Sequence, residues 1–212
     1  ELYNLDTLSL ELKLNFRNLT HEYLGLPIDT GQIVSIDKFI DEYDKASKGI
    51  ATPLDNTFIH RDKELAELED FIRKNDLVIL YGAPGVGKTK LALETIKKIV
   101  KDDISYKAYC VSYKNTSLIE DLQQYMHLDN NYILFVDDAN RIDNIGQIIG
   151  FYKTDRKGKL KIIITVRDYA YSTIEKICGT FLHISYTIKA FTDEQIVDIV
   201  KAEPFGILNT LY

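Results

Sequence analysis

Eight residues near the middle of the chain combine glycines, a lysine and a threonine at the spacing G-x-x-x-x-G-K-[ST]. They are Gly82, Ala83, Pro84, Gly85, Val86, Gly87, Lys88 and Thr89. Glycines let the backbone curl so that successive N–H groups point at phosphate oxygens. The Lys88 amine is expected to reach the β- and γ-phosphates, and the Thr89 hydroxyl to coordinate Mg²⁺. The pattern predicts that these residues and the adjoining Lys90 bind a nucleotide.

The residues on either side of this loop fit the same interpretation. Residues 77–81 form a continuous apolar run, which is typical of a strand buried on both faces. After the loop, Ala92, Ile96 and Ile99 fall on one helical stripe. A helix that begins here would turn its positive N-terminal end toward the phosphates. This context favours a phosphate-binding loop over the alternative, a Gly- and Pro-rich surface turn.

Two adjacent carboxylates follow a second buried strand. Asp137 and Asp138 come directly after the apolar run 132–136, and ligands of doubly wound sheets bind where such strands end. Asp137 is expected to position Mg²⁺ with Thr89, because this ion keeps several waters and takes few carboxylates. Asp138 is expected to orient or deprotonate the attacking water. The alternative is a pair of solvated acids that cap the next helix.

Three more residues are candidates for contact with the nucleotide. Arg167 follows the strand 160–165, where a guanidinium can contact the γ-phosphate and distinguish ATP from ADP. A surface ion pair, for example with Asp168, is the competing interpretation. Ile59 and Arg61 precede the first helix, and we expect Ile59 beside the base and Arg61 near the ribose or phosphates. The predicted catalytic residues are therefore Lys88, Asp138 and Arg167.

Composition limits the class of protein. The chain has 212 residues, a hydrophobic fraction of 45% and a net charge of −6, which suits one α/β domain with extensions. The acidic balance argues against broad nucleic-acid binding. No apolar run approaches the roughly 20 residues that span a bilayer. Cys110 and Cys178 lie in apolar stretches without C-x-x-C spacing and are expected to be reduced thiols, so we expect a cytoplasmic protein without a membrane partner.

The elements that position these residues form three zones. Residues 56–190 alternate strands and helices, which predicts an α/β P-loop NTPase domain with a mostly parallel five-stranded sheet between helices. The expected strands are 77–81, 106–111, 132–136, 160–165 and 182–188. The last of these alternates apolar and polar residues and is expected at an edge of the sheet.

The two flanking zones are expected to be extensions. Residues 1–55 are predicted to be an N-terminal extension or a linker from a preceding domain. They contain an alternating strand pattern at 8–16 and then apolar residues at helical spacing, namely Ile33, Ile36, Ile40 and Tyr43. Residues 191–212 open on a capping box at 192–195 and are expected to be the truncated start of a helical lid subdomain.

Taken together, the motifs resemble the STAND class of signalling NTPases, the relatives of NACHT and NB-ARC domains. Four motifs match in order: an hhGRxxE-like element at 58–64, the phosphate loop, an hhhhDD strand at 133–138 and a T-x-R strand end at 165–167. His60 departs from the pattern, because the family usually has Gly there. The resemblance implies a module that binds ATP or ADP with Mg²⁺ and hydrolyses ATP slowly. It further implies a larger antiviral defence protein, in which a C-terminal region senses a protein trigger and nucleotide controls homo-oligomerisation.

Two other functions remain open. An AAA+-type or archaeal-style ATPase that remodels DNA or protein would need an arginine finger and a further sensor arginine, and neither is identified in the sequence. A non-enzymatic scaffold with permanently bound nucleotide would usually have lost one of Lys88, Thr89, Asp137 and Asp138, all of which are present. No Asn-Lys-x-Asp element, which reads guanine, follows residue 165, and this favours adenine.

Overall fold

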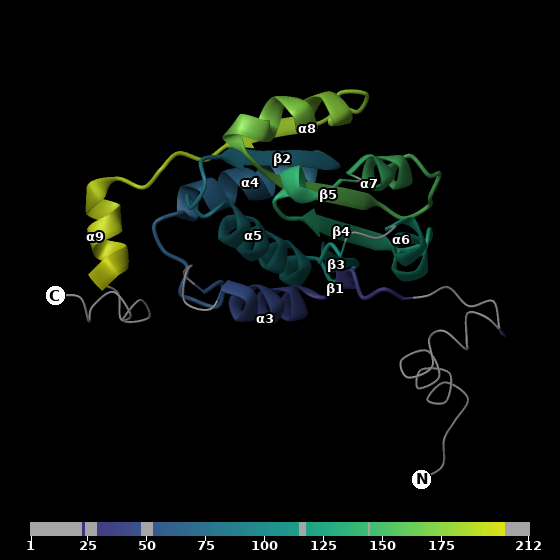
Figure 1. Cartoon of the computed structure of the whole chain (residues 1–212), viewed down its shortest axis with the longest axis horizontal. Coiled ribbons are helices and arrows are strands. Elements are labelled where there is room, and N and C mark those ends of the chain that lie inside the picture. Colours follow the sequence, from purple (N-terminus) through teal and green to yellow (C-terminus); the bar gives the residue numbers. More distant parts are fainter. Residues whose placement is uncertain (1–22, 24–28, 48–52, 115–117, 144, 202–212) are drawn as a thin grey trace, which may run out of the picture.

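The computed structural model describes residue 23 and residues 29–47, 53–114, 118–143 and 145–201. They form one six-stranded sheet with helices on both faces (Figure 1). The strand order is β1-β3-β4-β5-β2-β6. The strands are β1 (Ile33–Val34), β2 (Leu77–Gly82), β3 (Tyr106–Val111), β4 (Asn131–Val136), β5 (Leu160–Arg167) and β6 (Ile184–Thr187). The predicted α/β P-loop fold is confirmed.

One strand was not predicted. β1 pairs antiparallel with β3, so that Ile33 lies opposite Val111, whereas all other neighbouring strands are parallel. The expected count of five strands was therefore one too low. Ile33 was assigned to a helix by its spacing, but the helix α3 (Ile36–Ser47) begins three residues later. A strand of two buried residues is too short to show the alternation by which strands are recognised. The predicted edge position of β6 is confirmed.

Apolar residues fill a core on each face of the sheet. One core is formed with α6 (Ile119–Tyr125), α7 (Ile145–Tyr152) and α8 (Tyr171–Cys178). The opposite core is formed with α3, α4 (Asp62–Lys74) and α5 (Lys88–Asp102). Along β4, Leu134 packs into the first core, and Ile133 and Phe135 pack into the second. Burial of both faces explains why this strand reads as a continuous apolar run.

Two short 3₁₀ turns follow the strands that carry the candidate site residues at their carboxyl ends. The 3₁₀ turn η1 (Ala139–Arg141) follows β4, and η2 (Asp168–Ala170) follows β5. The helix α9 (Asp193–Lys201) lies beyond the end of the sheet (Figure 1). At its start, the Gln195 N–H donates to the Thr192 hydroxyl (3.3 Å), and the Thr192 N–H donates to the Gln195 side chain (3.0 Å). These two bonds are the capping box that the sequence predicted.

Residues 29–34 are attached to the sheet by polar contacts as well as by β1. The Asp121 carboxylate in α6 accepts hydrogen bonds from the Thr30 N–H (3.1 Å), the Thr30 hydroxyl and the Gln32 side chain (3.2 Å). Part of the predicted N-terminal extension thus belongs to the same sheet, while the boundaries at 55 and 190 stay predictions. The strand pattern expected at 8–16 lies outside the described residues. Within the described part, no helix has the length and apolar character to cross a membrane.

Candidate nucleotide-binding site

The predicted phosphate loop connects the end of β2 to the start of α5. Gly87, the residue before α5, has a φ of 89°, a left-handed conformation that glycine adopts without strain. At Gly82, an added Cβ would lie 2.7 Å from the carbonyl oxygen of Ile188, the residue that follows β6. A side chain at this position would therefore force one of the two backbone segments to move.

Replacing Gly82 by alanine is expected to destabilise the domain by about 1–3 kcal/mol, because one backbone segment must move to admit the methyl group. Urea unfolding followed by circular dichroism measures the change. Gly150→Ala is the matched control, since a Cβ there meets nothing within 4 Å and Gly150 lies in α7. Alanine at Gly150 should stabilise by about 0.5–1 kcal/mol. Equal effects of the two substitutions would contradict the close approach at Gly82.

Lys88 is held inside the loop by the loop's own carbonyl groups. Its Nζ donates to the carbonyl oxygens of Gly82 (2.9 Å) and Ala83 (2.8 Å). Burial lowers the pKa of Lys88, and the nearby carboxylates of Asp138 and Asp137 oppose this shift. Phosphate oxygens are stronger acceptors for an ammonium group than backbone carbonyls are. The geometry therefore suits an amine that exchanges carbonyl partners for phosphate oxygens.

The first acid of the pair is bonded to both neighbouring segments. One oxygen of Asp137 accepts hydrogen bonds from the hydroxyls of Thr89 (2.8 Å) and Thr165 (2.7 Å). The Thr165 hydroxyl in turn accepts the N–H of Asp138 (2.8 Å). Burial raises the pKa of Asp137, and the two threonine hydrogen bonds partly oppose the shift. Thr165 thus fixes the acid pair of β4 against β5, a role that the sequence analysis did not identify.

The second acid is bonded to two arginines. Arg167 donates from Nε and Nη2 to the two carboxylate oxygens of Asp138, at 3.1 and 2.9 Å. Arg141 Nε lies 2.9 Å from one of these oxygens. The alternative interpretation of Arg167 named Asp168 as the ion-pair partner, whereas the structure pairs Arg167 with Asp138. Arg141 was not predicted; its one signal was its position three residues after Asp138 in a turn.

A cleft of about 670 Å³ lies at this edge of the sheet. Its lining includes Lys88, Thr89, Asp137, Asp138, Thr165 and Arg167. Parallel strands end at the same edge, and for this reason residues 88, 137 and 167, distant in sequence, line one cavity. The edge on which the sequence analysis placed these residues is thus a cleft.

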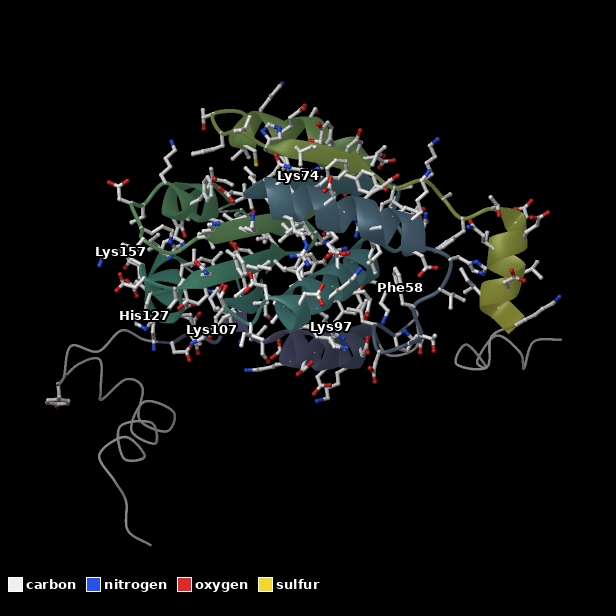
Figure 2. All side chains as sticks on the ribbon, turned by 180° about the vertical axis from the view of Figure 1, so that it is seen from behind. Phe58, Lys74, Lys97, Lys107, His127 and Lys157 are labelled. Atoms are coloured by element: carbon white, nitrogen blue, oxygen red, sulfur yellow. The ribbon has the colours of Figure 1, made fainter. Side chains whose placement is uncertain are left out.

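A second cavity of about 470 Å³ adjoins the phosphate loop, and many of its lining side chains are apolar. Its apolar lining includes Pro53, Leu54, Phe58, Ile59, Phe191 and Ile199. Phe58 lies on the side of the domain where α9 is found (Figure 2). Tyr43, Gly85, Lys88 and Thr89 line both cavities. The two cavities therefore meet at the phosphate loop.

Arg61 binds protein groups from three segments. One terminal nitrogen donates to the carbonyl oxygens of Val86 (3.2 Å) and Lys189 (2.7 Å), and the other lies 2.5 Å from Glu64. Its guanidinium stacks over the Phe191 ring at 3.9 Å from the centroid. Arg61 thus joins α4, the phosphate loop and the segment before α9, and its predicted contact with ribose or phosphate stays a prediction.

His60 and Lys90, which lie near the phosphate loop, both bind other parts of the protein. His60, at the position where the resembled family usually has Gly, adopts a φ of 60°, so the backbone keeps a conformation typical of glycine. Its Nε2 lies 3.4 Å from the Asp198 carboxylate in α9. The Lys90 amine donates to the Leu54 carbonyl (2.6 Å) and lies 3.0 Å from Glu94. The Lys90 side chain is thus engaged on the wall of the second cavity.

Comparison with known protein families identifies the family of this chain. The family model described as Novel STAND NTPase 3 matches residues 60–203, more than half of the chain. The chain belongs to this STAND NTPase family. The resemblance stated from the sequence motifs is thereby confirmed. A comparison with curated proteins found no match.

Solved structures similar to this STAND NTPase include two of Hsp104. The closed state with ATPγS and FITC casein matches with a TM-score of 0.56 at 17% identity, covering 81% of this chain and 32% of that chain. The Hsp104–ADP complex of S. cerevisiae matches with a TM-score of 0.53 at 17% identity, covering 80% of this chain and 26% of that chain. The STAND NTPase thus spans a third or less of these chains, and the likeness shows the common fold.

The oxygen atoms at the loop of this STAND NTPase fit Mg²⁺. The Thr89 hydroxyl and the Asp137 carboxylate are 2.8 Å apart and open onto the larger cleft. Both are hard oxygen donors, and an ion that keeps most of its waters needs few of them. Among the described residues, no three His, Cys, Asp or Glu side chains are arranged to hold a metal by themselves. Thr89 and Asp137 are therefore the protein groups that suit a magnesium ion bound with nucleotide.

Proposed function

We propose that this chain binds Mg·ATP, hydrolyses it slowly and acts as the nucleotide switch of a larger STAND signalling protein. The proposal rests on one observation: an ammonium, two carboxylates and a guanidinium from three strand ends line one cleft beside the phosphate loop. This is the set of groups that phosphoryl transfer to water requires, because its catalysis consists of positioning and charge stabilisation.

Each group has a separate role in the proposal. Lys88 and the N-terminus of α5 bind the β- and γ-phosphates. Thr89 and Asp137 hold Mg²⁺, which when bound neutralises charge on these phosphates. Asp138 orients the attacking water. Because both Asp138 oxygens already accept hydrogen bonds from arginines, a water must compete with Arg167 and Arg141. This competition supports slow turnover, which suits a switch.

The base side of the proposal uses the smaller cavity. Ile59 and Phe58 would cover one face of adenine, and Phe191 and Ile199 would approach it from the segment that includes α9. The proposal divides the chain into an ATPase domain at residues 56–190 and the start of a helical lid at residues 191–212. We further propose that nucleotide controls homo-oligomerisation in a cytoplasmic defence protein whose C-terminal region senses a protein trigger.

The switch requires that ATP and ADP be distinguished, and Arg167→Ala tests this. The substitution should lower ATP affinity about tenfold, because it removes a charged donor at the γ-phosphate end of the cleft. ADP affinity should stay within twofold. Titration calorimetry with both nucleotides and Mg²⁺ measures the difference, and Arg73→Ala is the control, since Arg73 pairs with Glu69 and Asp102 on α4 and α5.

Calorimetry of Arg167→Ala, together with sedimentation and hydrolysis assays of the wild type, separates the proposed switch from the alternatives. Equal losses for ATP and ADP would support a purely structural Arg167–Asp138 pair. The wild-type chain is expected to remain monomeric with Mg·ATP in sedimentation velocity and to turn ATP over slowly. Brisk hydrolysis with ring formation would favour the remodelling ATPase, and tight binding without any single-turnover hydrolysis would favour the scaffold.

A further inference from the structure

Helix α3 lies ahead of the region that the family model matches, and yet it forms one wall of the larger cleft. Four of its side chains line the cavity: Phe39, Glu42, Tyr43 and Ala46. The family match begins only at residue 60. In Figure 1, α3 lies on the same face of the sheet as α5, the helix that follows the phosphate loop. A segment outside the matched region thus contributes directly to the candidate site.

The position of α3 is fixed by packing and by hydrogen bonding. Phe39 is buried, and its ring contacts Phe135 of β4 edge to face, with ring centroids 5.8 Å apart. The Glu42 carboxylate accepts a hydrogen bond from the Ser112 hydroxyl (2.9 Å), directly after β3. The pairing of β1 with β3 fixes the residues that lead into the helix. The wall is therefore built onto the sheet.

Among the α3 residues that line the larger cleft, Tyr43 is the one best suited to bind a nucleotide. It is half-buried and lines both cavities, together with Gly85, Lys88 and Thr89. Its ring packs beside Phe39, with centroids 6.1 Å apart. No described residue receives a hydrogen bond from its hydroxyl. A tyrosine hydroxyl is protonated at neutral pH and can donate a hydrogen bond. Burial and the Asp137 and Asp138 carboxylates raise the pKa of Tyr43, in agreement with this. Tyr43 therefore presents a donor where the two cavities meet.

We propose that Tyr43 is a nucleotide-binding residue whose hydroxyl donates a hydrogen bond to the phosphate chain, so that α3 closes the site and responds to its occupancy. This proposal rests on the proposed function, because it takes the two cavities to hold a nucleoside phosphate. Phosphate oxygens only accept hydrogen bonds, and the Tyr43 hydroxyl is a donor. The neighbours that Tyr43 shares with both cavities are phosphate-loop residues, which places the contact at the phosphates.

The test compares Tyr43→Phe with the wild-type 212-residue chain, using fluorescent MANT-ATP and MANT-ADP with Mg²⁺. Loss of one hydrogen bond to a charged group should weaken binding by roughly tenfold. The unfolding temperature without nucleotide should stay unchanged, because no described protein group loses a partner. Tyr106→Phe is the matched control, since Tyr106 lies at the opposite end of β3 and should retain wild-type affinity.

Hydrogen exchange gives a second readout that does not depend on catalysis. Nucleotide should slow amide exchange in residues 36–46 of the wild type, and this protection should be reduced in Tyr43→Phe at equal site occupancy. If Tyr43→Phe binds within twofold of wild type and protects α3 equally, the role of Tyr43 is wrong while the proposed function stands. If the wild type itself binds no nucleotide, the proposed function fails and the role of Tyr43 fails with it.

Discussion

Replacing Lys88 by alanine is expected to weaken Mg·ATP binding by at least about a hundredfold, measured by isothermal titration calorimetry. The Lys88 amine now binds the carbonyl oxygens of Gly82 and Ala83, and in the complex it would bind the β- and γ-phosphates instead. Charge-assisted hydrogen bonds to two phosphates contribute roughly 1.5–3 kcal/mol each, which corresponds to this loss. A mutant affinity within threefold of wild type would contradict the assignment of the loop.

Lys97→Ala is the matched control for this substitution. Lys97 lies on the same helix as Lys88 and is labelled in Figure 2, and its side chain is partly exposed. Lys97 lies 3.6 Å from Glu94 and does not line either cavity. Its removal changes the net charge by the same amount as Lys88→Ala does. Equal losses from the two substitutions would show that overall charge, and not the position of Lys88, determines binding.

The two acids are expected to separate binding from hydrolysis. Asp138→Asn should leave Mg·ATP affinity within about threefold and slow single-turnover hydrolysis by roughly a hundredfold or more, because general-base assistance typically contributes 10²–10⁴-fold. Asparagine suits this test, since residue 138 has a φ of 48° and asparagine tolerates left-handed conformations well. Rapid-quench measurement of ADP formation gives the rate.

Asp137→Asn is the companion variant, and it should act on the metal instead. The Asp137 carboxylate accepts a hydrogen bond from the Thr89 hydroxyl, and both groups are expected to hold Mg²⁺. An uncharged asparagine amide at residue 137 should therefore raise the Mg²⁺ concentration that is needed for ATP binding. Titration of Mg²⁺ at fixed ATP measures this shift. If both variants lose affinity equally and neither slows turnover selectively, the division of roles between the two acids is wrong.

The arrangement of the larger cleft was largely predictable from sequence. Asp137 follows β4 and Arg167 ends β5, two strands whose apolar runs are clear in the sequence, and parallel strands bring their carboxyl ends to one edge. The phosphate loop was recognised by spacing and by its flanking strand and helix. These inferences depend on local patterns within each segment. One general rule, that parallel strands end at the same edge of the sheet, then places the residues together.

The remainder depends on contacts between distant segments, which local patterns do not encode. The hydrogen bonds of Arg61 to Val86 and Lys189 were not predicted, because they form only when three segments meet. The wall formed by α3 was missed for the same reason. Tyr43 showed helical spacing, but nothing within its own helix indicated that the helix would lie beside Asp137 and Asp138.

The hydrogen bond between Thr30 and Asp121 joins residues 91 positions apart in sequence, and this separation has a consequence for biosynthesis. At about 5–20 residues per second, the ribosome needs roughly 5–20 seconds to make the intervening chain. For most of that interval Ile33 and Val34 have no strand to pair with, because β3 is made only shortly before Asp121. The contacts of residues 30–34 with β3 and Asp121 can therefore form only after the β3–α6 segment has been translated, so this part of the sheet edge is completed late in synthesis.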